Sequence, residues 1–298
     1  MSVSLDWLGV STYRLVVDDL VIFLDAYIDR NPAAAPVGIR VADVQRADYV
    51  LVGHSHFDHL WGAERIAHQT GATIVGSHES VRLMEQEDVH GDQLVAVAGG
   101  ERVRLSDSVT VRVFPSQHSC IWSTTGASGE VCLGDLGLTL DEREANLRNW
   151  AAQRASSNVP GMAEAEAHMV ECAQRPRGEG GALAYFIETP HGSILWKDTS
   201  GHWTGILRDL RPDVALLAAA GRGNIDGEPI QGTLAQFVAR EADLLRPRSI
   251  VLGHHDNWNP PVTSPTDMEP IERELSRQAP NVELIQMDYL EDYPILGR

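Results

Sequence analysis

Short apolar runs recur along the chain, and polar residues follow each of them. The clearest runs are residues 48–52, 109–114, 193–197 and 249–253, which are rich in β-branched side chains. Such runs are typical of buried strands that end in loops. Longer amphipathic stretches with helix start and stop signals lie between them. This alternation of strands and helices predicts an α/β fold.

The same patterns predict the remaining elements. Further strands are expected at residues 73–75, 182–188 and 214–217, with short strands joined by a turn at 18–19 near the start and three more between 93 and 114. Helices are expected at 58–69, 77–87, 141–155, 160–175, 203–210 and 233–245. The second half of the chain thus repeats the strand and helix theme of the first.

The loop after the first run carries the densest chemistry of the chain, His54-Ser55-His56-Phe57-Asp58-His59. Ligands usually bind outside the carboxyl ends of strands in α/β folds. In an extended loop, His54, His56 and Asp58 converge on one point, and the turn into the next helix directs His59 to a second. Imidazole and carboxylate suit zinc, and also iron or manganese. The alternative is a polar loop whose histidines are solvated or cap the helix.

Three later runs also end in residues that can bind metals. His118 follows the run 109–114, Asp198 follows 193–197, and His254 with His255 follows 249–253. Each of these residues alone is more often a cap, a turn residue or a satisfied polar group. Their shared position after apolar strands favours a joint site.

His54 to His59 resembles the His-x-His-x-Asp-His signature of the metallo-β-lactamase superfamily, and the later motifs are similar to the superfamily's other ligand motifs. The resemblance implies a four-layer αβ/βα sandwich that holds two metals. One metal would be held by His54, His56 and His118, the other by Asp58, His59 and His254, with Asp198 between them. His255, beside the favoured ligand His254, would be a donor to substrate.

A metal-dependent hydrolase is the function that this resemblance implies. Two divalent cations, Zn²⁺ first and Mn²⁺ or Fe²⁺ next, would supply a bridging hydroxide, and Asp58 would orient it and pass a proton to the leaving group. The pattern is most similar to the ascorbate-6-phosphate lactonases and N-acyl-phosphatidylethanolamine phospholipases, so we expect a small lactone, ester or phosphodiester as substrate. The commonest zinc β-lactamases carry cysteine where Asp198 stands and lack His59. An iron-dependent dioxygenase and a non-catalytic metal-binding protein remain as alternatives.

Length and composition set limits on partners. The 298 residues, 43% of them hydrophobic, suit one metallo-hydrolase domain spanning 1–298. A formal net charge of −18 disfavours extended nucleic acid as a partner. Three cysteines without a paired spacing, together with the lack of a signal-like start or a membrane-length apolar run, indicate a cytoplasmic protein.

Residues 119–181 form a helical insertion that begins at the His118 motif. We expect it to cover the active site, to form a surface for a homo-oligomer, or both. Trp122, His202 and Trp258 are near the metal motifs in sequence and are expected to contact substrate, although an aromatic residue is more often part of the core.

Overall fold

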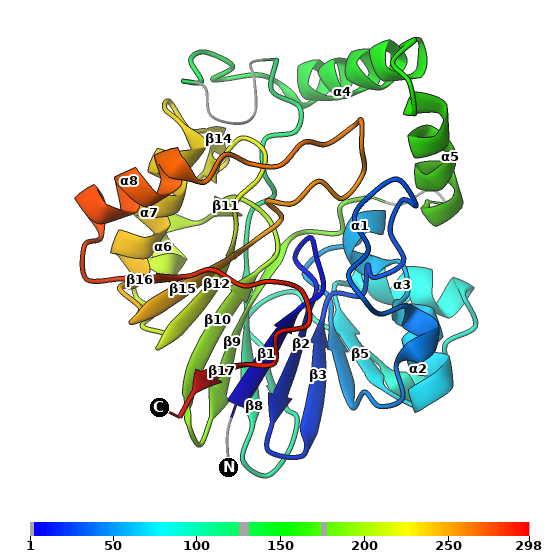
Figure 1. Cartoon of the computed structure of the whole chain (residues 1–298), viewed down its shortest axis with the longest axis vertical. Helices are drawn as coiled ribbons and strands as arrows, with labels where there is room; N and C mark the ends of the chain where they lie inside the picture. The colour runs from blue at the N-terminus through cyan, green and yellow to red at the C-terminus, as the bar shows by residue number, and fades with distance from the viewer. Residues whose placement is uncertain (1–2, 125–130, 174–177, 298) are drawn as a thin grey trace.

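The computed structural model describes residues 3–124, 131–173 and 178–297, and two seven-stranded sheets form its centre (Figure 1). The first sheet has the spatial order β17-β1-β2-β3-β4-β5-β6. Its strands are β1 (Val3–Trp7), β2 (Tyr13–Val17), β3 (Leu20–Leu24), β4 (Tyr49–Leu51), β5 (Thr73–Gly76), β6 (Leu94–Ala96) and β17 (Tyr293–Leu296). Because β3 to β6 are parallel, the loops that leave their carboxyl ends lie at one edge of the sheet.

The second sheet has the order β16-β15-β12-β10-β9-β8-β7. Its strands are β7 (Arg102–Arg104), β8 (Thr110–Pro115), β9 (Leu183–Thr189), β10 (Gly192–Lys197), β12 (Val214–Ala218), β15 (Ser249–Gly253) and β16 (Glu283–Ile285). Strand β10 runs parallel to β12 and onward to β15, and β8 points the same way because both β8 and β10 are antiparallel to β9. The loops after β8, β10 and β15 therefore leave one edge together.

The helices divide into a covering set and an outlying pair. They are α1 (Phe57–Leu60), α2 (Ala63–Thr70), α3 (His78–Gln86), α4 (Leu140–Ala155), α5 (Met162–Cys172), α6 (Thr204–Leu207), α7 (Leu234–Leu245) and α8 (Glu269–Gln278). The pair α4 and α5, green in Figure 1, lies beyond the strand ends instead of on a sheet face. Within the described residues, no helix combines the length and the apolarity needed to cross a bilayer.

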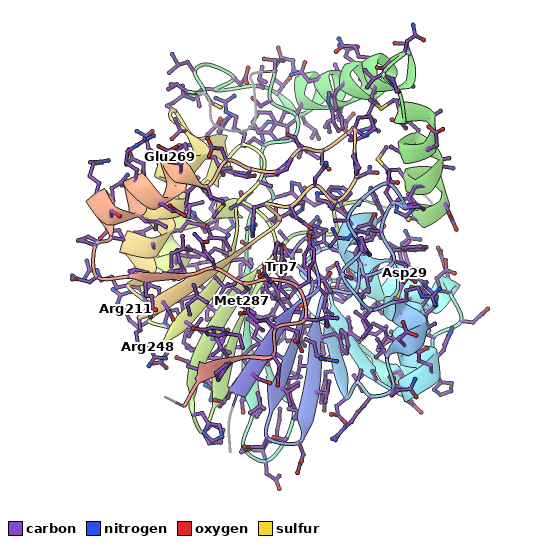
Figure 2. All side chains as sticks on the ribbon, viewed as in Figure 1. Trp7, Asp29, Arg211, Arg248, Glu269 and Met287 are labelled. Carbon is purple, nitrogen blue, oxygen red and sulfur yellow. The ribbon has the colours of Figure 1, made fainter. Side chains whose placement is uncertain are left out.

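Three apolar clusters show the layers. The inner cluster joins side chains of both sheets, such as Leu15 and Trp196, and includes Trp7 and Met287, which are labelled in Figure 2. A second cluster packs α7 and α8 on the outer face of the second sheet, and a third packs α2 and α3 on the first. This order of helix, sheet, sheet and helix confirms the predicted four-layer sandwich.

The predicted helix at residues 58–69 is two helices. It breaks after α1 because Gly62 takes a left-handed backbone (φ 110°), and a Cβ there would lie 2.6 Å from the Ala26 carbonyl oxygen. The Ala26 N–H also donates to the His59 carbonyl oxygen at 2.8 Å. The break is therefore imposed by the neighbouring segment, which comes from a distant part of the chain.

Other differences are smaller. The helix predicted at 203–210 is the four-residue α6, preceded by β11 (Gly201–His202), which forms a small sheet with β13 (Asn224–Ile225) and β14 (Glu228–Pro229). The predicted helix 160–175 ends at Cys172, and residue 175 lies outside the described residues. No prediction was made for α8, β16 or β17; the last is an edge strand containing proline, a weak sequence pattern.

Candidate metal centre

The loop after β4 is held so that its side chains point inward. Its first residue, Gly53, donates its N–H to Asp25 Oδ1 at 3.0 Å, and its carbonyl oxygen accepts from the Leu183 N–H at 2.8 Å. A Cβ on Gly53 would lie 2.1 Å from the carboxyl carbon of Asp198. Only glycine therefore allows the loop and Asp198 to approach this closely.

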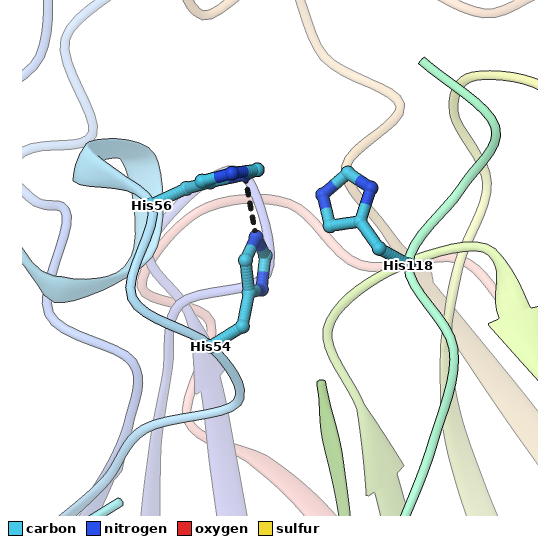
Figure 3. Close-up of side chains that lie close together, drawn as sticks. All are labelled: His54, His56 and His118. Atoms are coloured by element: carbon cyan, nitrogen blue, oxygen red, sulfur yellow. Dashed lines mark hydrogen bonds between the residues drawn. The ribbon is translucent and has the colours of Figure 1, made fainter. Parts of the chain in front are cut away.

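Three groups of ligating atoms meet at this edge of the two sheets. Within each group, one atom from every residue lies within 4.8 Å of the others. The groups are His54, His56 and His118; His54, His59 and Asp198; and Asp58, His59 and His254. Figure 3 shows the rings of His54, His56 and His118 close together, with 3.0 Å between His54 Nε2 and His56 Nδ1. All seven residues predicted as metal ligands are thus brought together.

Asp198 lies between the two outer groups. Its Oδ2 accepts from His54 Nδ1 at 2.5 Å and is 3.4 Å from His59 Nδ1. Its Oδ1 is buried and has no hydrogen-bond partner. A buried, unpartnered carboxylate oxygen is costly unless a cation satisfies it. The position of this oxygen therefore fits a carboxylate that binds metal.

Hydrogen bonds at Nδ1 orient three of the histidines, and two of the three partners lie outside the predicted ligand set. The Nδ1–H groups of His54, His59 and His118 donate to Asp198, Asp25 and the Ser119 carbonyl oxygen. In the neutral form of each ring, Nε2 is then the unprotonated nitrogen. Such hydrogen-bond partners fix the tautomer of a metal-binding histidine. Once neutral, these three rings therefore present Nε2 to a cation.

The group of Asp58, His59 and His254 depends on an unusual backbone position. His254 has a left-handed backbone (φ 61°), its N–H donates to the Val10 carbonyl oxygen at 2.6 Å, and its Nε2 is 3.4 Å from Asp58 Oδ2. A positive φ is strained for histidine and is often found at functional sites. This strained backbone conformation places the His254 ring beside Asp58.

Asp25 is a site residue that was not predicted. Its Oδ2 accepts from His59 Nδ1 at 2.6 Å, and it is fully buried. Asp25 follows an apolar strand, as the metal-binding motifs do, and that signal could have found it. It acts by orienting His59 and Gly53, so it is a positioning residue.

The charges of the cluster match a cation site. Burial lowers the pKa of His54 to about 4 and that of His56 well below its usual value. Burial alone would raise the pKa of Asp58, but His59 and His254 lower it well below the ordinary carboxyl value. For Asp198 burial is likewise outweighed by His54 and His59, and the pKa is lowered. Neutral imidazole and ionised carboxylate are the forms that bind metals.

The pKa of His59 reflects the negative charge around its ring. Burial would lower its pKa, but Asp58, Asp25 and Asp198 raise it well above the usual value. Burial also raises the pKa of Asp25 to about 7, although His59 opposes the shift. So many buried carboxylates require positive charge, which bound cations would provide.

A cavity of about 670 Å³ adjoins the cluster. Its wall includes four of the predicted ligands, His56, Asp58, His118 and His254, and also Trp258. The volume suits a small molecule. Trp258 is therefore placed where a substrate contact was expected.

Three other predicted site residues have partners elsewhere, and their expected contacts with substrate stay predictions. The His255 ring stacks on Trp7 with centroids 4.6 Å apart, Trp122 packs under the Arg143 guanidinium, and the fully buried His202 donates from Nδ1 to Glu241 at 2.8 Å. None of the three is among the described residues that line the cavity. Only His254 of the 254–255 pair is grouped with the other ligating side chains, because the His255 ring lies against Trp7.

Sequence comparison agrees with the fold and the site. Residues 21–147, which include the first histidine motif and His118, match the family model described as a beta-lactamase superfamily domain. This part of the chain is similar to the metallo-β-lactamase superfamily. A UPF0173 metal-dependent hydrolase from Pyrobaculum neutrophilum is 31% identical over 113 residues, which is 38% of this chain and 49% of that protein. The alignment with this curated relative thus spans about half of its length.

Two solved structures share the superfamily fold over nearly all of this chain. Igni18, a metallo hydrolase from Ignicoccus hospitalis, has a TM-score of 0.62 and 18% identity, covering 97% of this chain and 96% of that chain. CmlA, a diiron beta-hydroxylase from Streptomyces venezuelae, has a TM-score of 0.56 and 13% identity, covering 96% of this chain and 53% of that chain. At these identities the likeness concerns the fold alone.

Proposed function

We propose that this protein is a dinuclear metal-dependent hydrolase of small esters, lactones or phosphodiesters. The observation that carries the proposal is the buried, unpartnered Oδ1 of Asp198 between two groups of ligating side chains. The names of the curated relatives, metal-dependent hydrolases, support the same class of activity. The lactonase-like and phospholipase-like branches stay predictions.

The ligand assignment follows the three groups. His54, His56 and His118 would hold one cation, Asp58, His59 and His254 the other, and Asp198 both. Nitrogen and oxygen ligands of this kind favour Zn²⁺, with Mn²⁺ or Fe²⁺ as alternatives. When bound at these residues, divalent cations would lower the pKa of a bound water and act as Lewis acids towards the substrate.

The residues of the chain have distinct tasks. Asp58 is 8% exposed and lines the cavity, so its carboxylate can accept a proton from the attacking water and return it to the leaving group. Asp25 orients His59, and Gly53 gives Asp198 the space it occupies. We also propose that the helical insertion roofs this site, because α4 and α5 contribute Trp150 and Met169 to the cavity wall.

Asp198→Ala tests the proposal. We expect metal content to fall below two ions per chain, and hydrolysis of a panel of esters, lactones and phosphodiesters to be abolished with it. The measurements are elemental analysis and turnover on the same preparation. Asp209→Ala, which removes an exposed carboxylate, should change neither. Full occupancy and full rate in Asp198→Ala would contradict the shared role of Asp198.

An iron-dependent oxygenase is the second candidate, because the diiron hydroxylase CmlA shares the fold. Iron as the native metal, together with oxygen consumption and no hydrolysis on the panel, would favour it over the hydrolase.

A further inference from the structure

The lining of the cavity beside the metal cluster contains two unlike sets of side chains. One set is polar and contains His56, Asp58, His118 and His254. The other set, called the apolar side below, comes from the segment after β8, from α4 and α5, and from the loop after β15, namely Ile121, Trp150, Met169, Val170 and Val262. A molecule that reaches the metal ligands with one end must therefore lay its other end against hydrocarbon.

The charged side chains of the wall outside the ligand set are already paired. Arg154, the one lysine or arginine among the described lining residues, forms an ion pair with Glu166, and its guanidinium lies 4.4 Å from the centre of the Trp150 ring. Asp256 accepts from Arg30 at 2.8 Å and from the Tyr289 hydroxyl at 2.9 Å. A charged group entering this part of the cavity would lose water without gaining an unpaired partner.

Several apolar side chains at this wall remain open to solvent. Ile121 is 44% exposed, Trp150 50% and Val170 70%. Their grouping around one cavity, next to the proposed reaction centre, is what a hydrophobic ligand would cover. Each buried methylene of such a ligand would add to binding.

We propose that the substrate carries an uncharged hydrophobic arm, which binds against Ile121, Trp150 and Val170 while its reacting group lies at the metal ligands. The arm would be an aliphatic or aromatic acyl group of an ester or lactone. Ile121 and Val170 are then residues that determine specificity. The position of the reacting group at the metal ligands rests on the proposed function, but the binding of the arm does not.

Binding of straight-chain carboxylates tests the arm without requiring turnover. Acetate, butanoate, hexanoate, octanoate and decanoate are titrated into the zinc-loaded protein, and quenching of tryptophan fluorescence is measured. We expect affinity to rise roughly threefold for each added methylene until the apolar side is filled. Octanedioate, which carries a second charge at the far end of the arm, should bind at least tenfold more weakly than octanoate. Equal affinity for acetate and octanoate would overturn the proposal.

Exposed positions give variants that should fold. Ile121→Asp and Val170→Asp place a charge on the apolar side, and each should weaken octanoate about tenfold while leaving acetate unchanged. The matched control is Leu140→Asp, because Leu140 is 70% exposed on α4 and does not line the cavity. If Leu140→Asp weakened octanoate as much as the other two variants, the assigned side would be wrong.

Turnover separates this proposal from the proposed function. The p-nitrophenyl esters of the same acids should show kcat/KM rising with chain length in the wild type. Chain-length-dependent binding without hydrolysis of any ester, lactone or phosphodiester would remove the hydrolase and leave the hydrophobic arm. Hydrolysis with equal kcat/KM for acetyl and octanoyl esters would leave the hydrolase and remove the arm.

Discussion

The metal cluster and the pair α4 and α5 both contribute to the wall of one cavity, and they are built in opposite ways. His54, His59 and Asp198 are almost completely buried, and their side chains are fixed by partners from distant strands. Helix α4 buries none of its residues, and α5 buries only Ala165, His168, Met169 and Cys172. The groups that would perform the proposed chemistry are therefore held in place, whereas the surface proposed to bind the substrate's arm is attached by few contacts.

The largest effect is expected where the cluster tolerates no added atom. Gly53→Ala places a Cβ 2.1 Å from the carboxyl carbon of Asp198, so the loop or the carboxylate must move. We expect a loss of about 1–3 kcal/mol in the free energy of unfolding. We also expect metal content and turnover to fall together. Urea denaturation and elemental analysis measure these changes.

Gly91→Ala is the control for this substitution, because no atom lies within 4 Å of a Cβ at that position. It should retain both stability and metal. If Gly53→Ala retained full metal content as well, the close approach to Asp198 would not be what holds the cluster.

A smaller effect on metal binding is expected at Asp25, which contacts the predicted ligand His59. Asp25→Asn keeps the shape of the side chain but exchanges a carboxylate for an amide beside His59 Nδ1. Loss of such an outer partner typically weakens metal binding about 10–100-fold. Competition with a chelator should show one of two cations released more easily than the other. Equal release of both, at the wild-type affinity, would show that Asp25 does not orient His59.

The sequence predicted the cluster better than its surroundings, for a physical reason. Apolar runs that end in polar residues mark strand ends, and parallel strands bring those ends to one edge, so His118, Asp198 and His254 could be joined to the first motif. The break at Gly62 depends on contact with Ala26, which no local pattern contains.

The direction in which individual side chains point could also not be predicted from the sequence. His202 is engaged by Glu241 on the buried face of α7, and His255 by Trp7 on β1, and both partners are distant in the chain. The position of Asp25 after an apolar strand could have marked it as a candidate, but its role in orienting His59 depends on a contact that the sequence does not show. Residues that act through another side chain are recognised only when that neighbour is known.

The hydrogen bond that attaches α5 to the rest of the protein should make stability depend on pH. The Tyr27 O–H donates to His168 Nε2 at 2.7 Å, and burial lowers the pKa of His168 below its ordinary 6.5. The unfolded chain therefore takes up this proton first as the pH falls. The contribution of His168 to stability should be complete above pH 6.5 and decline below it.

His168→Gln removes this titration and keeps a polar side chain. Free energies of unfolding from urea denaturation, measured from neutral to mildly acidic pH, should fall less steeply in the variant than in the wild type. Parallel profiles for the two proteins would show that His168 does not couple α5 to pH.

The smallest effect is expected at the link between α4 and α5. Arg154 pairs with Glu166, and the two side chains are 17% and 26% exposed. Partly exposed ion pairs contribute about 0–1 kcal/mol. Arg154→Met should therefore leave the free energy of unfolding almost unchanged, while the thioether keeps the apolar contact with Trp150. Arg148→Met, which removes an exposed pair with Glu144 within α4, is the control. A loss in Arg154→Met several times larger than in the control would mean that α4 and α5 are held as firmly as the metal cluster, and the contrast between the two sides of the cavity would disappear.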